Sequence, residues 1–151
     1  MASDVALLAA ADRVYYPDVM LVCGEAAAVE RLVRAPSLVA EVTSPSTRAT
    51  DQREKLEVYL RLPSLRTYLI VDQRRRHVVR HTREGADAPW QREESTALDD
   101  RIAVPSLGTS FALGELYDGV TLPPMTVREE FDAWVAEEEA MREAEDVRAS
   151  R

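Results

Sequence analysis

Residues 38–60, LVAEVTSPSTRATDQREKLEVYL, decide how the rest of the chain is interpreted. The segment 37–43 alternates its side chains between two faces and is apolar on both, which predicts a central strand covered on both sides. Glu41 lies within that strand, where a carboxylate must be paired, metal-bound or protonated. SPSTRAT is typical of a turn, and Thr50 can cap a helix that runs to about Leu62.

Lys55 lies on this expected helix. It is the single lysine among 19 lysine and arginine residues, which leaves 18 arginines. A lysine offers a compact ammonium group whose pKa shifts readily, whereas an arginine can hardly release a proton. The helix is expected to pack back on the preceding strand, near Glu41. Two structural alternatives remain open: Glu41 paired with an arginine such as Arg66, and Lys55 paired with Asp51 one turn earlier.

The other segments indicate a mixed α/β sheet. Strands are expected before Tyr16 and at residues 18–23, 66–72, 77–82 and 101–104, and the segment 105–120 is expected to be a loop followed by a short turn or helix. The pair 66–72 and 77–82 should form a hairpin through residues 73–76. On the helix, Leu56, Tyr59 and Leu60 form the expected core face. Cys23, the only cysteine, is expected to be a small buried strand residue.

A length of 151 residues suits one domain, which we expect to span residues 1–124. That part holds 18 acidic and 15 basic residues, while residues 125–151 hold 9 and 4, so the tail carries −5 of the net charge of −8. Thr126 and Glu129 form a capping box that predicts an acidic C-terminal helix over 125–151. Its apolar stripe would dock on the domain or pair with a second copy: Val127, Phe131, Trp134 and Met141.

The apolar run VALLAAA near the N-terminus is too short to span a bilayer, which takes roughly 20 apolar residues. Asp4 precedes it and no basic residue does, so it lacks the charged start of a signal peptide. We therefore expect a soluble, cytoplasmic protein without a membrane partner.

Asp18 follows Pro17 at the start of an expected strand. If this strand neighbours the one that holds Glu41, the two carboxylates converge at one edge of the sheet, although an aspartate in this position is more often a turn or cap residue. Converging carboxylates suit Mg²⁺, which takes oxygen ligands, polarises phosphoryl oxygens and lowers the pKa of a bound water. The Lys55 ammonium would then stabilise charge that builds up on a phosphate, or orient the attacking water.

The motifs YPDV, LVAEVTSPSTRATDQREKLEVYL, YLIVD, PSLG and LGELYDGV, in this order over residues 14–120, resemble the Uma2 family of restriction-endonuclease-like proteins, within the PD-(D/E)XK nuclease superfamily. The resemblance implies a restriction-endonuclease-like mixed sheet flanked by helices, and an Mg²⁺- or Mn²⁺-dependent endonuclease that hydrolyses phosphodiester bonds in DNA. It implies that Asp18, Glu41 and the backbone carbonyl of Val42 bind the metal. Lys55 matches the position of the catalytic lysine in this family. The superfamily usually has its lysine two residues after the second acidic residue, and Thr43 occupies that position here.

Family members carry a further upstream segment with a helix and the first strand or hairpin of the sheet, so the resemblance implies that this chain is truncated at its N-terminus. Asp4 and Asp12 are poor substitutes for the acidic residue that the superfamily often takes from that helix. A second copy of the chain or another partner could then complete the sheet. The alternative function is a catalytically inactive remnant of the nuclease fold that acts as a binding or interaction module.

The segment RRRHVVRHTR, residues 74–83, can be read as a small basic patch for nucleic acid or as a solvated hairpin tip, and the second reading is favoured. Candidate phosphate contacts are Arg74, Arg75, Arg76 and Arg80. His77 and His81 have no cluster of further histidines or cysteines around them, so they do not indicate a transition-metal site.

Overall fold

The computed structural model describes residues 5–23, 32–43, 50–124 and 126, with the backbone alone at 50–53. The strands found there are β1 (Ala6–Ala10), β2 (Arg13–Tyr15), β3 (Val19–Leu21), β4 (Leu32–Val33), β5 (Leu38–Thr43), β6 (Thr67–Asp72), β7 (Val78–Thr82), β8 (Gln91–Ser95), β9 (Arg101–Val104) and β10 (Thr109–Ala112). The helices found there are α1 (Thr50–Leu60), the 3₁₀ turn η3 (Pro105–Leu107) and α2 (Leu113–Leu116). All of these elements lie in the unit Met1–Val120.

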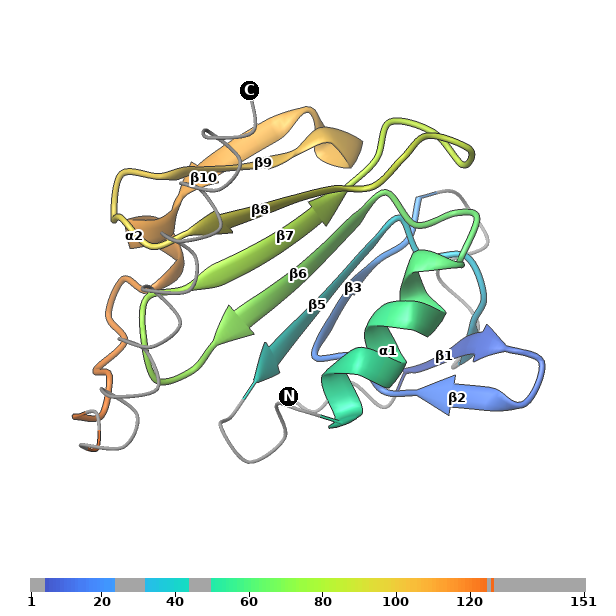
Figure 1. Cartoon of the computed structure of the whole chain (residues 1–151), viewed down its shortest axis with the longest axis horizontal. Helices are drawn as coiled ribbons and strands as arrows, with labels where there is room; N and C mark the ends of the chain where they lie inside the picture. The colour runs from blue at the N-terminus through green and yellow to red at the C-terminus, as the bar shows by residue number, and fades with distance from the viewer. Residues whose placement is uncertain (1–4, 24–31, 44–49, 125, 127–151) are drawn as a thin grey trace, which may run out of the picture. The chain divides into compact units, whose positions relative to one another are not determined.

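Five strands form the main sheet, in the order β3-β5-β6-β7-β8 (Figure 1). β5 pairs antiparallel with β3 and parallel with β6, and the other neighbours are antiparallel. A parallel pair needs a crossover connection, and α1 lies in that connection between β5 and β6. Two smaller sheets, β2-β1-β4 and β10-β9, complete the described part. The expected mixed α/β class is therefore confirmed, with mostly strand and little helix.

The core lies between α1 and the main sheet, and Figure 1 shows α1 across one face of that sheet beside the β1–β2 hairpin. Tyr59 is fully buried, Leu56 packs against the same cluster and Leu60 is half-buried, so the expected core face of the helix is confirmed. Strand alternation turns Val39 and Glu41 of β5 towards α1, and the paired residue Tyr68 of β6 shares that face. The helix therefore covers the one face of β5 that carries a carboxylate.

The end of α1 is held by Arg83, which is only 8% exposed. Its guanidinium donates hydrogen bonds to the carbonyl oxygens of Leu62 and Leu65, which follow the helix, and lies 4.6 Å from the centroid of the Trp90 ring. The Trp90 Nε1 donates to the Leu60 carbonyl at 3.1 Å. Carbonyl groups at a helix end have no partner within the helix, and the Trp90 hydrogen bond satisfies the one at Leu60. Arg83 holds the segment that follows α1.

The hairpin of β6 and β7 agrees with the prediction, whereas β1, β4, β8 and β10 are not predicted from the sequence. β8 consists of polar and charged residues, and its pairing with β7 outweighs its low strand propensity. The predicted burial of Cys23 is wrong. β3 ends at Leu21, so Cys23 lies beyond the sheet and is exposed.

Other expectations concern parts outside the described residues. The acidic helix over 125–151 is among these, apart from Thr126, and so are Asp4 and the side chain of Asp51. Among the described residues, no helix has the length and apolar character that crossing a membrane requires.

His81 makes part of the stability dependent on pH. It is buried on β7, and its ring stacks on Tyr68 with centroids 6.2 Å apart. Burial, followed by the charge of Arg92, lowers the pKa of His81 below its ordinary 6.5. The unfolded chain therefore binds more protons than the folded one between these two pKa values. The contribution of neutral His81 to the free energy of unfolding is complete above about pH 6.5 and is lost as the pH falls through the pKa of the folded state.

We expect the His81→Phe variant, which keeps an aromatic ring against Tyr68, to lose this dependence. The free energy of unfolding, measured by urea denaturation at a series of pH values from about 7.5 to 5, should fall more for the wild type than for the variant. If the difference in the free energy of unfolding between the two proteins stays constant over this pH range, the pH dependence does not come from His81.

Candidate active site

The structure brings Asp18 and Glu41 together at one end of the β3–β5 pair. Val19 pairs with Ala40 in antiparallel register, so the next position along sets Asp18 opposite Glu41. Side chains opposite each other in such a pair lie on the same face, with Cβ atoms about 5 Å apart. Asp18 is exposed at this edge, whereas Glu41 is buried. The two carboxylates thus lie at the boundary between core and solvent.

Glu41 meets its countercharge on α1. Its Oε2 lies 3.4 Å from the Lys55 Nζ, and its Oε1 accepts a hydrogen bond of 2.9 Å from the Tyr59 hydroxyl. Burial raises the pKa of Glu41, and the charge of Asp18 adds to this, while Lys55 and Tyr59 act in the opposite direction. The net direction is upward. A buried carboxylate of this kind is stable only with such partners.

Of the two sequence alternatives, the pairing of Glu41 with Arg66 can be judged, whereas the pairing of Lys55 with Asp51 involves a side chain outside the described residues. Glu41 does not pair with Arg66, whose guanidinium instead donates to the carbonyl oxygens of Pro63 and Leu65. Lys55 contacts Glu41, and its side chain is 20% exposed, so the ammonium is within reach of solvent. Lys55 and Tyr59 are four residues apart and therefore project from the same face of α1, which is why both reach Glu41.

Tyr59 belongs to the site, although sequence reasoning assigned it to the core alone. Its ring packs edge-on against Tyr15 and Tyr68, with centroids 5.5 and 5.2 Å away. Burial and the neighbouring Glu41 raise the pKa of Tyr59, so its hydroxyl stays protonated and donates to the carboxylate. The signal in the sequence was the spacing from Lys55, because a buried tyrosine hydroxyl usually needs a polar partner.

Val42 contributes its backbone to the same edge. Its N–H donates to the Asp18 Oδ2 at 2.7 Å. The N–H and the carbonyl of a strand residue point towards the same neighbouring strand, so the Val42 carbonyl also faces the β3 side. Two carboxylates and one carbonyl are hard oxygen donors, which suit Mg²⁺ or Mn²⁺.

The donor set fits a divalent cation that takes further ligands from elsewhere. Among the described residues, no group of three or more histidine, cysteine, aspartate or glutamate side chains could hold a metal. Mg²⁺ is often bound by one or two carboxylates and keeps several waters or substrate oxygens. Each oxygen of Glu41 also retains lone-pair capacity beside the hydrogen bond it accepts. The metal-binding roles of Asp18, Glu41 and Val42 stay predictions.

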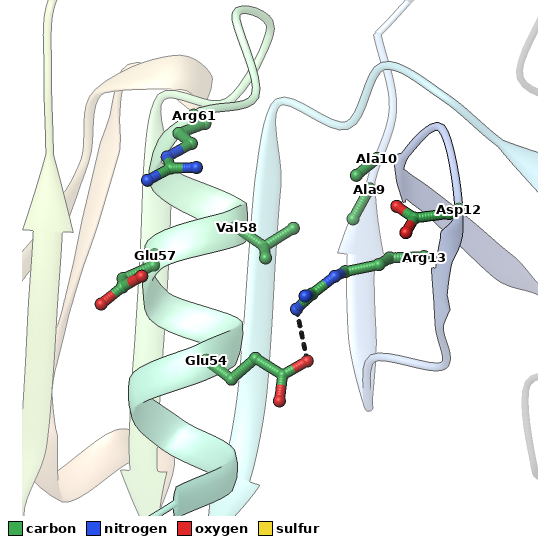
Figure 2. A pocket seen from close by; sticks show the side chains of 8 residues that line it. All are labelled: Ala9, Ala10, Asp12, Arg13, Glu54, Glu57, Val58 and Arg61. Atoms are coloured by element: carbon green, nitrogen blue, oxygen red, sulfur yellow. Dashed lines mark hydrogen bonds and ion pairs between the residues drawn. The ribbon is translucent and has the colours of Figure 1, made fainter.

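A separate pocket of about 310 Å³ opens between α1 and the β1–β2 hairpin (Figure 2). Asp12 lines it, together with Arg13 and Glu54, which form an ion pair. The Tyr15 hydroxyl donates to the same Glu54 carboxylate at 3.0 Å. Neither Asp18 nor Glu41 lines this pocket, so the structure does not bring Asp12 into the candidate site.

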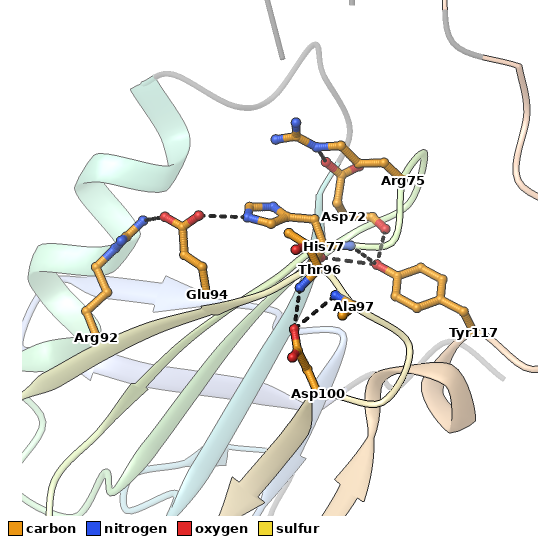
Figure 3. Close-up of polar contacts among 9 residues, drawn as sticks. All are labelled: Asp72, Arg75, His77, Arg92, Glu94, Thr96, Ala97, Asp100 and Tyr117. Carbon is orange, nitrogen blue, oxygen red and sulfur yellow. Dashed lines mark hydrogen bonds and ion pairs between the residues drawn. The ribbon is translucent and has the colours of Figure 1, made fainter. Parts of the chain in front are cut away.

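The basic hairpin is largely engaged within the fold. Arg80 is 8% exposed, donates to the Ala103 carbonyl at 2.9 Å and pairs with Glu93, so its prediction as a phosphate contact is wrong. The reason is that its strand, β7, is paired on both sides, with β6 and β8, and an arginine buried there must itself be paired. Arg75 pairs with Asp72 (Figure 3). Arg76 is exposed.

Comparison with known proteins identifies the relatives of the chain. The model of the Uma2 family, described as "Putative restriction endonuclease", matches residues 1–114. The chain belongs to the Uma2 family. Two similar proteins are from Synechocystis sp. and are described as uncharacterized. One is 35% identical over 92 residues, covering 58% of this chain and 51% of that protein. The other is 32% identical over 105 residues, covering 69% and 54%. This Uma2 chain therefore spans about half the length of these relatives.

The fold is also shared with a solved structure. A crystal structure from Anabaena variabilis, described as "a putative nuclease belonging to DUF820", superposes with a TM-score of 0.57. The sequence identity is 15%, and the match covers 76% of the Uma2 chain and 65% of the other chain. At this identity the similarity shows a common fold.

We expect Tyr59→Phe to destabilise the protein by about 1–2 kcal/mol, because it leaves a buried oxygen of Glu41 without its hydrogen-bond donor. The free energy of unfolding from urea denaturation near neutral pH measures this loss. Tyr15→Phe is the matched control, since it removes a hydroxyl bonded to the exposed Glu54, and it should change stability by less than about 0.5 kcal/mol. Equal losses in the two variants would count against a special role for the Tyr59 hydroxyl.

Proposed function

We propose that the chain is a metal-dependent endonuclease with the restriction-endonuclease-like fold of the PD-(D/E)XK superfamily, and that it hydrolyses phosphodiester bonds in DNA. One observation carries the proposal. Asp18, directly before β3, lies opposite Glu41 of the adjacent strand β5, and the Lys55 Nζ is 3.4 Å from the Glu41 Oε2. Membership of the Uma2 family and the fold shared with the Anabaena variabilis protein support it.

Each residue has a distinct task in this proposal. Asp18, Glu41 and the carbonyl of Val42 would hold Mg²⁺ or Mn²⁺ at the edge of the sheet. Such a cation, when bound, polarises a phosphoryl oxygen and lowers the pKa of a coordinated water. Asp18 is exposed, so a phosphate of the substrate can approach this edge from solvent.

Lys55 would act on the phosphate or on the attacking water. Its ammonium is held beside Glu41 on a helix, which fixes its position before the substrate arrives. A positive charge fixed in this way stabilises the negative charge that develops on the phosphate during attack, without reorganisation. Tyr59 would act through Glu41, because its hydrogen bond fixes the orientation of the carboxylate. It is a positioning residue in this proposal.

Glu41→Gln tests the reaction, because glutamine keeps the size of the side chain and can still accept the Tyr59 hydrogen bond. We expect the rate of Mg²⁺-dependent cleavage of plasmid DNA to fall by more than about 100-fold, because removing one electrostatic group at a reacting centre has an effect of this size. Glu54→Gln is the control, because it removes an exposed carboxylate from α1, away from Glu41, and should leave cleavage unchanged. In the same preparations, calorimetric titration with Mn²⁺ should give heat with the wild type and none with Asp18→Asn. Cleavage that persists in Glu41→Gln would exclude this mechanism.

Lys55→Arg tests why the chain has a lysine at this position. The variant keeps a positive charge beside Glu41 but replaces a compact ammonium with a wider planar fork. We expect the free energy of unfolding to change by less than about 1.5 kcal/mol, while the cleavage rate falls by about tenfold or more. Plasmid cleavage and urea denaturation measure the two quantities on the same preparation. A variant that cleaves as fast as the wild type would show that charge alone suffices.

The second candidate function is a nuclease-fold module that binds but does not cleave. One observation favours it, because both oxygens of Glu41 already accept hydrogen bonds from protein groups, Tyr59 and Lys55. The Mn²⁺ titration separates the two candidates. A binding module without the metal site gives no heat in the wild type, whereas the enzyme gives heat that Asp18→Asn abolishes.

A further inference from the structure

The turn between β6 and β7 holds an arginine in a fixed orientation. Asp72, the last residue of β6, is only 3% exposed. Its Oδ1 accepts a hydrogen bond from the Arg74 N–H at 2.9 Å, and its Oδ2 accepts one from the Arg75 Nε at 2.8 Å. The Tyr117 hydroxyl closes the same turn by donating to the Asp72 carbonyl at 2.6 Å (Figure 3). The anchor of Arg75 is thus buried and fixed from several sides.

The contact with Asp72 uses one nitrogen of the Arg75 guanidinium. Within the described part of the chain, no hydrogen bond or ion pair engages Nη1 or Nη2, and the side chain is 33% exposed. Figure 3 shows the guanidinium pointing away from Tyr117. Two N–H groups on one edge of a guanidinium match two oxygens of a phosphate, which is the bidentate geometry that arginine provides and lysine does not.

The anchor lies on the same face of the sheet as the candidate active site. Asp72 pairs with Thr43 in the parallel register of β5 and β6, and Glu41 precedes Thr43 by two residues. A rise of about 3.3 Å per residue and a strand spacing of about 4.8 Å then set the Cα atoms of Asp72 and Glu41 about 8 Å apart. Paired and alternate residues share a face, so both side chains project towards the α1 side.

A separation of this size is spanned by a short stretch of nucleic-acid backbone. Each DNA strand carries one phosphate per about 3.4 Å of helix axis. A strand whose phosphodiester bond lies against Glu41 therefore carries another phosphate within a few nucleotides, close enough to the anchor Asp72 for Arg75 to reach it. Because Asp72 already restricts the arginine, little side-chain freedom is lost when the phosphate binds.

We infer that Arg75 binds a backbone phosphate of the DNA strand that the Asp18–Glu41 site attacks, and that Asp72 orients it for this contact. The inference rests on the proposed function and adds a substrate contact to it. The inference also assigns different roles to the arginines of the hairpin. Arg76 is exposed without a comparable anchor among the described residues, and Arg80 is engaged inside the sheet.

Binding of a fluorescently labelled DNA duplex to the full chain, in EDTA and at a series of NaCl concentrations, tests this contact without cleavage. Arg75→Gln should weaken binding roughly tenfold, as expected for loss of hydrogen bonds to a charged group. It should also make the plot of log affinity against log salt shallower by about 0.9, the contribution of one phosphate. Arg75→Lys restores the charge without the fork, so it should recover the salt dependence but only part of the affinity.

Arg76→Gln is the matched control, because it removes the same charge from the next residue and should leave the salt dependence unchanged. Thermal unfolding verifies that each variant is folded. If Arg75→Gln does not fold, the affinity of Arg75→Lys is compared with that of the wild type instead. Equal effects of Arg75→Gln and Arg76→Gln would overturn the inference. An unchanged salt dependence of binding in Arg75→Gln would also overturn it. If the wild type still cleaves DNA, the proposed function survives that result. A wild type that neither binds nor cleaves DNA overturns both.

Discussion

The arrangement of the molecule depends on one buried carboxylate. Glu41 lies on the face of β5 that α1 covers, where an unpaired charge would strongly destabilise the fold. Lys55 and Tyr59 supply the ammonium and the hydroxyl that it needs, from positions one helical turn apart. Rotating α1 by a single residue, about 100°, would carry both groups away from the carboxylate. The need to satisfy Glu41 therefore fixes the rotation of the helix as well as its contact with the sheet.

The same contact serves stability and the proposed chemistry. Lys55 balances the charge of Glu41 in the folded chain, and in the proposed reaction its ammonium also acts on the phosphate. Trp90 binds the Leu60 carbonyl at the C-terminal end of α1, and Arg83 binds the segment that follows, so this end of the helix that carries Lys55 is held in place. A group placed by packing in this way needs no movement to reach its partner, which is the condition under which electrostatic stabilisation is most effective.

Sequence reasoning found the parts of the fold that are governed by local pattern. The alternation in β5, the helix after SPSTRAT and the β6–β7 hairpin each follow from periodicity and turn residues. Asp18, Glu41 and Lys55 were selected by residue type and order, and the structure brings them to one edge of the sheet. β8 was missed because its polar residues form a strand only through pairing with β7. The contact of Tyr59 with Glu41 was missed because its partner lies 18 residues away. The pairing of Arg80 with Glu93 likewise depends on strand register, which the sequence does not reveal.

The two borders of the main sheet have opposite chemical character. β8, at one border, carries Arg92, Glu93 and Glu94, all exposed. Charged side chains on an edge strand oppose the addition of a further strand from another molecule, so this border resists aggregation. β3 lies at the other border, where Val19 is 53% exposed. Any extension of the sheet by an added strand is therefore favoured at the β3 border, on the side of the molecule that carries Asp18.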